Sequence, residues 1–342
     1  MANEIEKVNT IAIADIEKIM GKTDDNIEKL SGFEFTGVTF PAWAGTRGVV
    51  AGGTQTAHAD LDVIQYKTVG ATANTVDFGD LQSFRSQHMC AGSNQTTGIW
   101  GGGMGRVGGS QVYGVSDTDY ITIASTGDGT DFGDVDVAGA YGIKNGCSNG
   151  TLLFSVGGYE TTAGNLDRME YFTIASTGNG TDAGNLSGTK LTMGGTNGDT
   201  RYLVLGGFKG GTATVNDIEY NDFSTSANVT DFGNLSAASL DSSSANSTVR
   251  AVFVVPSAGG GNNTIEYVTV GSTGNSSDFG DLATGRAELA GSSDGITGEF
   301  YGGDDGTVTD EIDKITIAST GNGADIGNLL EGNQDCGATS GS

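Results

Sequence analysis

Basic residues and long apolar runs are scarce in this sequence of 342 residues. Lys and Arg number 16 against 42 Asp and Glu, which gives a formal net charge of −26 at pH 7. Because phosphate recognition needs clustered positive charge, nucleic acid is not expected as a partner. No segment approaches the roughly 18 apolar residues that a membrane-spanning helix needs, and the N-terminus lacks a basic start followed by an apolar run. We therefore expect neither membrane insertion nor a signal peptide.

Histidine and cysteine are also too few for most metal and disulfide chemistry. The two histidines, His58 and His88, do not favour a copper-oxidase centre, which would add Tyr and Cys ligands to two histidines. Cys90, Cys147 and Cys336 are odd in number and widely spaced, and we interpret them as small buried residues of inner strands. The sequence thus predicts no metal, no cofactor and no catalytic residues.

Glycine, in contrast, is abundant, and it belongs to a repeat. The chain has 59 glycines and only 2 prolines, with an apolar fraction of 36%, which fits neither collagen nor a disordered tract. One pattern recurs six times, as DFGDL (77–81), DFGDV (131–135), DAGNL (182–186), DFGNL (231–235), DFGDL (278–282) and DIGNL (325–329). In protein kinases Asp-Phe-Gly holds magnesium, but a kinase needs one such site, so six copies indicate architecture. Their spacing of about 50 residues is typical of a kelch-type propeller blade.

Each repeat predicts a set of antiparallel strands. Alternating residues place a tyrosine on one face of the segments IQYKTV (64–69), TDYITI (118–123), MEYFTI (169–174), IEYNDF (218–223) and IEYVTV (265–270), and IDKITI (312–317) has Lys instead. Glycine pairs precede five of these strands, at 52–53, 101–103, 157–158, 206–207 and 302–303, where positive φ and close backbone approach are expected. STGNG-type segments follow the strands and predict tight hairpins. Arg47, Arg85 and Arg286 are expected to support contacts between neighbouring repeats.

These glycine pairs, tyrosines and following phenylalanines resemble the kelch repeat family over about residues 45 to 342. The resemblance implies blades of four strands, with Phe in place of the family's Trp on the fourth strand. The first repeat lacks its first strand, and residues 335–342, DCGATSGS, could supply it and remove the open edges. The expected fold is therefore all-β: a six-bladed kelch-like β-propeller (41–342) closed by a C-terminal strand and preceded by a short N-terminal segment (1–40).

The N-terminal segment carries its own repeat of 11 residues, IEKV (5–8), IEKI (16–19) and IEKL (27–30). Glycines follow two copies, so we predict short helical turns with glycine stops. Turns this short cannot hold a core alone, so they are expected to dock on the propeller, on sister copies or on another protein. The apolar residues assigned to this role are Ile5, Val8, Ile16, Ile19, Ile27 and Leu30.

This N-terminal pattern is similar to the opening of structural proteins of tailed bacteriophages, including those of marine hosts. The resemblance implies a tail-fibre or virion-surface protein, made in the host cytoplasm, with residues 1–40 bound to other virion proteins. It also implies a homo-oligomer, taken here as a trimer. The propeller would then face the host.

The connections between repeated strands offer the candidate binding residues. The longest is MGRVGGSQVYGVSD (104–117), which contains Arg106 and Tyr113, and neighbouring loops contribute Tyr159, Phe208 and Lys209. Aromatic rings are suited to stacking on sugars, so a host-surface glycan or protein is the expected ligand. Solvated loops with incidental aromatics are an equal alternative for these residues. The alternatives for the whole chain are a capsid or tail decoration protein without receptor binding and, third, a polysaccharide-degrading enzyme.

Overall fold

The computed structural model describes residues 40–55, 59–87, 89–107, 110–112, 115–135, 146–160, 163–256 and 262–342, together with six two-residue strands before residue 40. The chain divides into two compact units, Met1–Phe40 and Pro41–Ser342. The residues so described contain strands and turns and no helix, so the prediction of an all-β fold is confirmed.

The described residues of the first unit form three short hairpins rather than helical turns. They pair β1 (Lys7–Val8) with β2 (Ile11–Ala12), β3 (Lys18–Ile19) with β4 (Lys22–Thr23), and β5 (Lys29–Leu30) with β6 (Phe33–Glu34). Each register leaves two residues between the strands, and the second of them is glycine in two hairpins, as tight hairpin connections prefer. The prediction of helical turns was wrong, because four-residue periodic pieces cannot meet the cost of helix nucleation. Val8, Ile19 and Leu30 lie in these strands, whereas Ile5, Ile16 and Ile27 lie outside the described residues.

The second unit contains six four-stranded antiparallel sheets, numbered here in chain order. Sheet 1 is β38 (Gly337–Gly341), β7 (Arg47–Ala51), β9 (Ala59–Thr68) and β10 (Val76–Ser86). Sheet 2 is β11 (Cys90–Ser93), β12 (Thr97–Gly101), β15 (Asp117–Thr122) and β16 (Thr130–Asp134), and sheet 3 is β17 (Cys147–Ser148), β18 (Leu152–Val156), β21 (Arg168–Thr173) and β22 (Thr181–Asn185). Sheet 4 is β24 (Gly194–Asn197), β25 (Arg201–Leu205), β28 (Asp217–Asp222) and β29 (Thr230–Asn234). Sheet 5 is β30 (Ser243–Asn246), β31 (Arg250–Val254), β32 (Thr264–Thr269) and β33 (Ser277–Asp281), and sheet 6 is β34 (Ala290–Ser293), β35 (Thr297–Tyr301), β36 (Glu311–Thr316) and β37 (Ala324–Asn328).

Short additional strands extend the connections between these sheets. β8 (Thr54–Gln55) pairs with β9, and the hairpin β13 (Met104–Val107)–β14 (Ser110–Val112) pairs with β10, so that sheet 1 grows to seven strands. β19 (Tyr159–Glu160) pairs with β20 (Gly164–Asn165), and β23 (Lys190–Leu191) joins the hairpin of β26 (Phe208–Lys209) and β27 (Ala213–Thr214).

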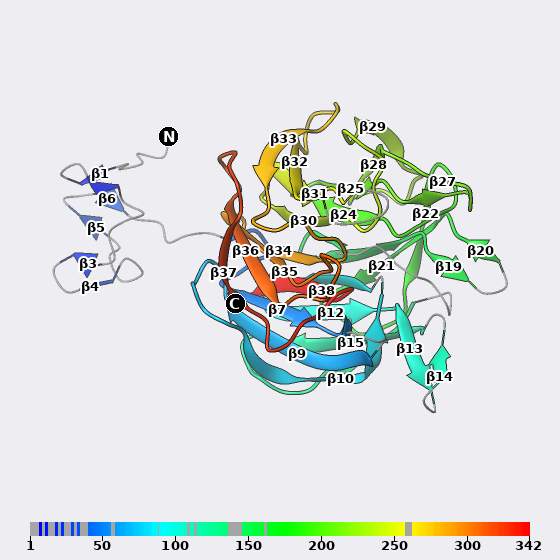
Figure 1. Ribbon diagram of the computed structural model, residues 1–342, viewed down its shortest axis with the longest axis horizontal. Coiled ribbons are helices and arrows are strands. Elements are labelled where there is room, and N and C mark those ends of the chain that lie inside the picture. Colours follow the sequence, from blue (N-terminus) through cyan, green and yellow to red (C-terminus); the bar gives the residue numbers. More distant parts are fainter. Residues whose placement is uncertain are drawn as a thin grey trace. The chain divides into compact units, whose positions relative to one another are not determined.

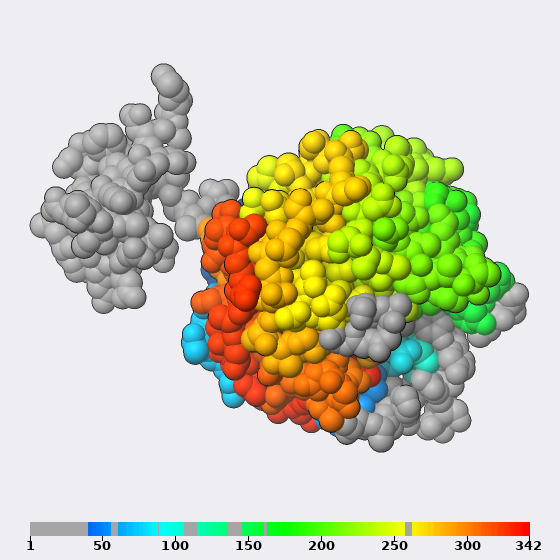
Figure 2. Space-filling view, turned by 45° about the horizontal axis from the view of Figure 1, so that its top comes forward, coloured from blue at the N-terminus to red at the C-terminus, as the bar shows by residue number. Residues whose placement is uncertain are grey.

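The first strands of the six sheets form a central ring. Contacts run from β38 to β11, β17, β24, β30 and β34, and from β34 back to β38. Figure 1 shows β24, β30, β34 and β38 near the middle of this unit and the fourth strands β10, β29, β33 and β37 at its periphery. Figure 2 shows the sheets following one another in chain order, from green through yellow to orange and red. Sheet 1 takes its first strand from the C-terminus, where Gly337 pairs with Ala51 and Gly341 with Arg47.

A buried apolar cluster lies between each sheet and the next. Between sheets 2 and 3, Phe132 of the DFGDV segment meets Phe172 edge-on, with ring centroids 6.0 Å apart. Between sheets 6 and 1, Tyr301 and Ile312 share a cluster with Val50 and Ala338. Burial of apolar surface at all six junctions is the main term that holds the sheets together.

The DFGD-type segments explain how closely neighbouring sheets approach. The amide of Gly178, in the turn after the tyrosine strand of sheet 3, donates to Phe132 O of sheet 2 at 2.7 Å, and a Cβ on Gly133 would lie 2.5 Å from Gly178 O. In the same contact, Asn179 Oδ1 accepts the amide of Asp134. The equivalent bond from a strand amide to a turn carboxylate or amide joins Asp80 to Asp128, Asn185 to Asn228, Asn234 to Asn275, Asp281 to Asn322 and, from sheet 6 to sheet 1, Asn328 to Asn74. The repeated glycine and the Asp or Asn of the turn thus form the same contact at each junction between sheets.

Other predicted features of the repeat are also present. The glycine pairs adopt positive φ, for example 58° at Gly206 and 105° at Gly207. Cys90 and Cys147 lie buried in first strands, where burial raises the pKa of each thiol to about 12.

All three arginines assigned to contacts between repeats make them. Arg47 donates to Ile123 O of the next sheet at 2.6 Å, Arg85 pairs with Asp119 at 3.1 Å, and Arg286 pairs with Asp313 at 2.9 Å.

Candidate functional site

The second unit has two ends that differ in their connections. At the turn end, three residues join the first and second strands of each of sheets 2 to 6, as at 94–96 and 149–151. At the hairpin end, longer connections join the second and third strands and include the hairpins β13–β14, β19–β20 and β26–β27. The chain enters this unit at the turn end, because Pro41 O accepts from Gln95 Nε2 and a Cβ on Gly150 would lie 2.4 Å from Ala42 O.

One polar position recurs in all six first strands, near the turn end. It is occupied by Ser93, Ser148, Asn197, Asn246, Ser293 and Ser340, each facing the second residue of the neighbouring strand. We call these six residues the polar ring.

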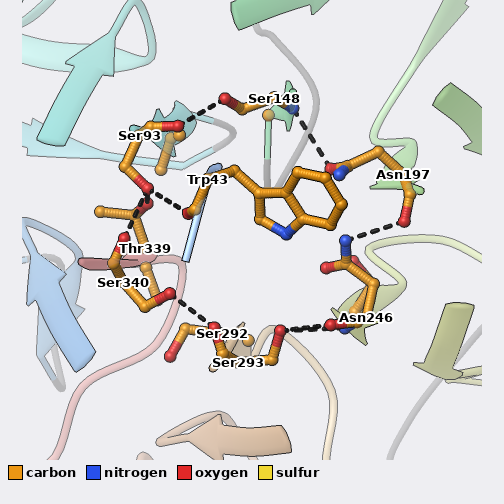
Figure 3. Close-up of a pocket in the computed structure, with 15 residues that line it drawn as sticks. Trp43, Ser93, Ser148, Asn197, Asn246, Ser292, Ser293, Thr339 and Ser340 are labelled. Carbon is orange, nitrogen blue, oxygen red and sulfur yellow. Dashed lines mark hydrogen bonds between the residues drawn. The ribbon is translucent and has the colours of Figure 1, made fainter. Parts of the chain in front are cut away.

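Hydrogen bonds connect the polar ring around its full circle (Figure 3). Five side chains donate to the backbone carbonyl of the preceding sheet, for example Ser148 Oγ to Ser93 O at 2.6 Å and Asn246 Nδ2 to Asn197 O at 2.8 Å. At the sixth junction the direction reverses, because Asn197 Oδ1 accepts the amide of Ser148 at 3.2 Å. The ring is thus built from residues of every sheet.

Trp43 lies inside the polar ring. Its side chain is 6% exposed, and its carbonyl oxygen lies 2.9 Å from Ser93 Oγ. Beside the indole is a cavity of about 40 Å³, lined mainly by Ser, Thr, Asn, Gly and Ala from the first strands. Figure 3 shows the indole nitrogen pointing into the space that the ring encloses. Sequence analysis singled out neither Trp43 nor the polar ring.

A buried network extends from this cavity to an ion pair between sheets 6 and 1. Ser292 Oγ lies 2.9 Å from Tyr301 OH, which donates to Glu299 Oε2 at 2.6 Å. Glu299 Oε1 in turn pairs with Lys67 Nζ at 2.6 Å, and both charged side chains are essentially unexposed. Burial and then the adjacent Glu299 carboxylate raise the pKa of Tyr301 well above its usual value. Tyr301 therefore stays protonated and acts as a donor to Glu299.

The residues predicted to bind a ligand lie at the hairpin end. Arg106 is in β13, but its side chain and all of Tyr113 fall outside the described residues. Tyr159 is half-buried in β19, and Phe208 and Lys209 are half-buried in β26. The structure thus places Arg106, Tyr159, Phe208 and Lys209 in hairpins that connect the second and third strands of sheets 2, 3 and 4, and Figure 1 shows these hairpins on one flank of the unit.

Lys209 belongs to a charged cluster between sheets 3 and 4. Its Nζ lies 3.0 Å from Ser187 Oγ and 3.2 Å from Asp217 Oδ2. Asp217 also pairs with the buried Lys190 at 2.6 Å, and Lys190 lies 2.9 Å from Glu219. Lys209 is therefore partly neutralised, and its side chain, 33% exposed, remains accessible on the surface.

Glu170 occupies in sheet 3 the position that Glu219 occupies in sheet 4, and the pKa of its carboxyl group is raised. Burial is the largest cause that raises the pKa of Glu170 to about 7, while Arg168 opposes the shift and Asp182 adds to it. Raised carboxyl pKa values occur in active sites and equally in buried structural positions. Glu170 lies in a sheet junction, as do Asp119 and Glu219 at the matching positions of sheets 2 and 4.

The turn end also has an open hollow of about 560 Å³ over sheets 3 to 5. Arg201 in this hollow is paired with Asp222 at 3.1 Å and donates to Gly271 O, so its charge is already balanced. Within the described ranges, no three His, Cys, Asp or Glu side chains gather as metal ligands would. No helix of the described residues is long and apolar enough to cross a membrane.

No protein-family model matches the chain, and no curated protein sequence matches it.

Proposed function

We propose that the six sheets are the blades of a closed, kelch-like β-propeller. Three repeated features support this proposal: the ring of contacts between first strands, the apolar cluster at every junction, and the bond between strand amide and turn residue that also joins sheet 6 to sheet 1. The pairing of β38 with β7 supplies the strand that sheet 1 lacks. Such closure leaves no open sheet edge at the ring.

We further propose that the chain is a surface protein of a tailed-phage virion, a tail fibre or adhesin. In this proposal residues 1–40 bind other virion proteins, and the hairpin end binds a glycan or protein of the host surface. One observation carries the proposal: the chain enters the second unit at the turn end, opposite the hairpins of sheets 2 to 4. A unit held through its N-terminal side would thus present its most varied connections outward.

The chemistry of the hairpin end suits weak binding of a sugar. Phe208 offers a half-buried ring, which can stack on the apolar face of a sugar, and Lys209 beside it offers an N–H donor. Because a small number of such contacts gives low affinity, several copies acting together would supply the avidity. An oligomer, for which we propose a trimer, would meet this need.

The test is binding of the purified full chain, presented on multivalent beads, to host cells and to a panel of host-envelope glycans. We expect retention that falls at least fivefold in Phe208→Ala and is unchanged in Val249→Ala, which alters a residue 61% exposed at the turn end. Removal of residues 1–35 should leave bead-borne binding intact and abolish attachment to particles. The adhesin proposal would be contradicted if all variants were retained equally, or if the full chain showed no retention on host cells or glycans.

The same assay separates the other two candidates. A decoration protein would stay on particles and bind no host component, and its removal would leave adsorption unchanged. A polysaccharide-degrading enzyme would release soluble product from a glycan of the panel.

A further inference from the structure

Among the residues that the structure describes, one buried donor beside the cavity inside the polar ring has no hydrogen-bond partner. Trp43 Nε1 makes no hydrogen bond to any residue in the part of the chain that the structure describes, although the side chain is 94% buried. Buried N–H groups nearly always have a partner, in the protein or in ordered water. This N–H points into the cavity (Figure 3), so its partner is to be sought there.

Each hydroxyl group around the cavity already donates its proton in a hydrogen bond to another residue. Ser93 Oγ donates to Ser340 O at 2.7 Å, Ser293 Oγ to Asn246 O at 2.6 Å, and Ser244 Oγ to Gly195 O at 2.6 Å. Ser148 and Ser340 donate to carbonyl groups in the same way, and Thr339 donates to Ser93 Oγ. Ser292 donates to Tyr301 OH, because the single proton of Tyr301 goes to Glu299. Each of these hydroxyls is left with oxygen lone pairs and no free proton.

This arrangement of hydrogen-bond donors and acceptors limits which ligands the cavity can hold. A metal cation would meet the Trp43 N–H, which repels it, and an anion would meet the hydroxyl lone pairs. The occupant must accept one hydrogen bond from an indole and donate to hydroxyl oxygens. Water does both, and the cavity of about 40 Å³ exceeds the roughly 10–15 Å³ that is needed to hold one water molecule.

We propose that this cavity is a buried hydration site, in which one water molecule accepts from Trp43 Nε1 and donates to an oxygen of the polar ring. The water joins the indole to a ring to which every sheet contributes. Trp43 is thereby a plug at the turn end, held to the sheets through water.

The two tryptophans of the chain provide the test, because one is a matched control. Trp100 Nε1 donates directly to Gly337 O at 3.1 Å and is fully buried. In the full chain with ¹⁵N-labelled tryptophan, we expect the Trp43 indole N–H to show a nuclear Overhauser cross-peak of negative sign to water, the sign of a long-lived bound molecule. We expect no such peak for Trp100. Trp43→Phe assigns the two resonances by loss of one of them.

A crystal structure of the unaltered protein at high resolution gives a second readout. We expect density for water about 2.7–3.2 Å from Trp43 Nε1 and within hydrogen-bond reach of a polar-ring oxygen. Absence of the water cross-peak together with an empty cavity would overturn the proposal. So would an anomalous peak in the cavity after exchange of chloride for bromide, which would identify an anion site.

Discussion

The glycine of each DFGD-type segment sets the distance between neighbouring sheets. In five of the six segments the φ of this glycine lies between 142° and 153°; these are Gly79, Gly133, Gly233, Gly280 and Gly327. In the sixth segment, φ is 103° at Gly184. Residues other than glycine rarely adopt such a positive φ. A Cβ at each of these positions would also meet the backbone of the next sheet's turn. Sequence analysis placed the Phe of this segment on the fourth strand of a blade. It could not predict the contact of the glycine, because that contact depends on a turn about 45 residues away in the chain.

Replacement of one such glycine should therefore be costly. A Cβ in Gly280→Ala would lie 2.4 Å from Gly321 O on a backbone with φ of 149°, so we expect a loss of about 2–4 kcal/mol in the free energy of unfolding. Gly271→Ala is the matched control, since a Cβ there has nothing within 4 Å. Chemical denaturation measures both, and equal stability of the two variants would count against the account of the junction.

Glu170 makes stability depend on pH in an unusual direction. Its pKa is raised from 4.5 to about 7 in the folded protein, so the folded state binds the proton more tightly than the unfolded state does. Stability from this group is complete below about pH 4.5, falls as pH rises towards 7, and is absent above it. Glu170→Gln should therefore raise the free energy of unfolding at pH 8 by up to about 3 kcal/mol, and by little at pH 4.5.

The control is the equivalent residue of sheet 5. Glu266 accepts hydrogen bonds from the hydroxyls of Ser236 and Ser276, so Glu266→Gln should gain nothing at either pH. Urea unfolding at pH 4.5 and pH 8 measures the change in the free energy of unfolding that each of the two variants causes. A Glu170→Gln gain that does not change with pH would show that burial of the charge is not its cause.

Trp43 and the polar ring show what the sequence conceals at the scale of residues. The ring positions recur at intervals of 47 to 55 residues, close to the period of the aromatic and glycine positions. An alignment of the six repeats on those positions would have revealed them. They were missed because Ser and Asn are also the commonest residues of turns, and Trp43 lies before the first repeat, where no pattern marks it.

At the scale of elements, a buried cation meets an acid of the third strand at three alternate junctions, in addition to the Lys67–Glu299 pair between sheets 6 and 1. Arg85 of sheet 1 enters sheet 2, Lys190 enters sheet 4 and Arg286 enters sheet 6, each meeting an acid of the third strand. The matching cations share no common position: Arg85 lies in β10, Lys190 in the short β23 and Arg286 in the connection before β34. Arg85 and Arg286 were assigned to contacts between repeats, and Lys190 was missed.

Removal of one buried cation should destabilise the molecule far more than removal of an exposed one. Arg286→Met would leave the carboxylates of Glu311 and Asp313 without their partner, and we expect a loss of about 3–5 kcal/mol. Arg201→Met breaks a pair whose members are 26% and 47% exposed, and should cost about 1 kcal/mol or less. Thermal and urea unfolding of both variants make the comparison, and similar losses would contradict the distinction.

The hairpins of residues 1–40 illustrate the limit of pattern reading for short elements. Sequence analysis found the 11-residue repeat, and the structure has one hairpin per repeat. The type of element was wrong, because two-residue strands are too short for periodicity to tell them from a helical turn.

At the scale of the whole molecule, the account depends on the C-terminal strand completing the ring. All five residues of β38 are buried, and they pair with β7 in continuous register. The incomplete first repeat predicted this strand, since a missing element at one end and an extra one at the other are visible in a repeat sequence. The proposed closed ring is the framework on which the turn end, the hairpin end and the proposed binding surface depend.

Hydrogen–deuterium exchange of the intact chain, followed by mass spectrometry, tests this closure most directly. The account predicts that the amides of residues 337–341 that bond to β7 exchange as slowly as those of residues 290–293 in β34, the equivalent strand of sheet 6. Complete exchange of 337–341 within seconds, while 290–293 stay protected, would show that the C-terminal strand does not close the ring.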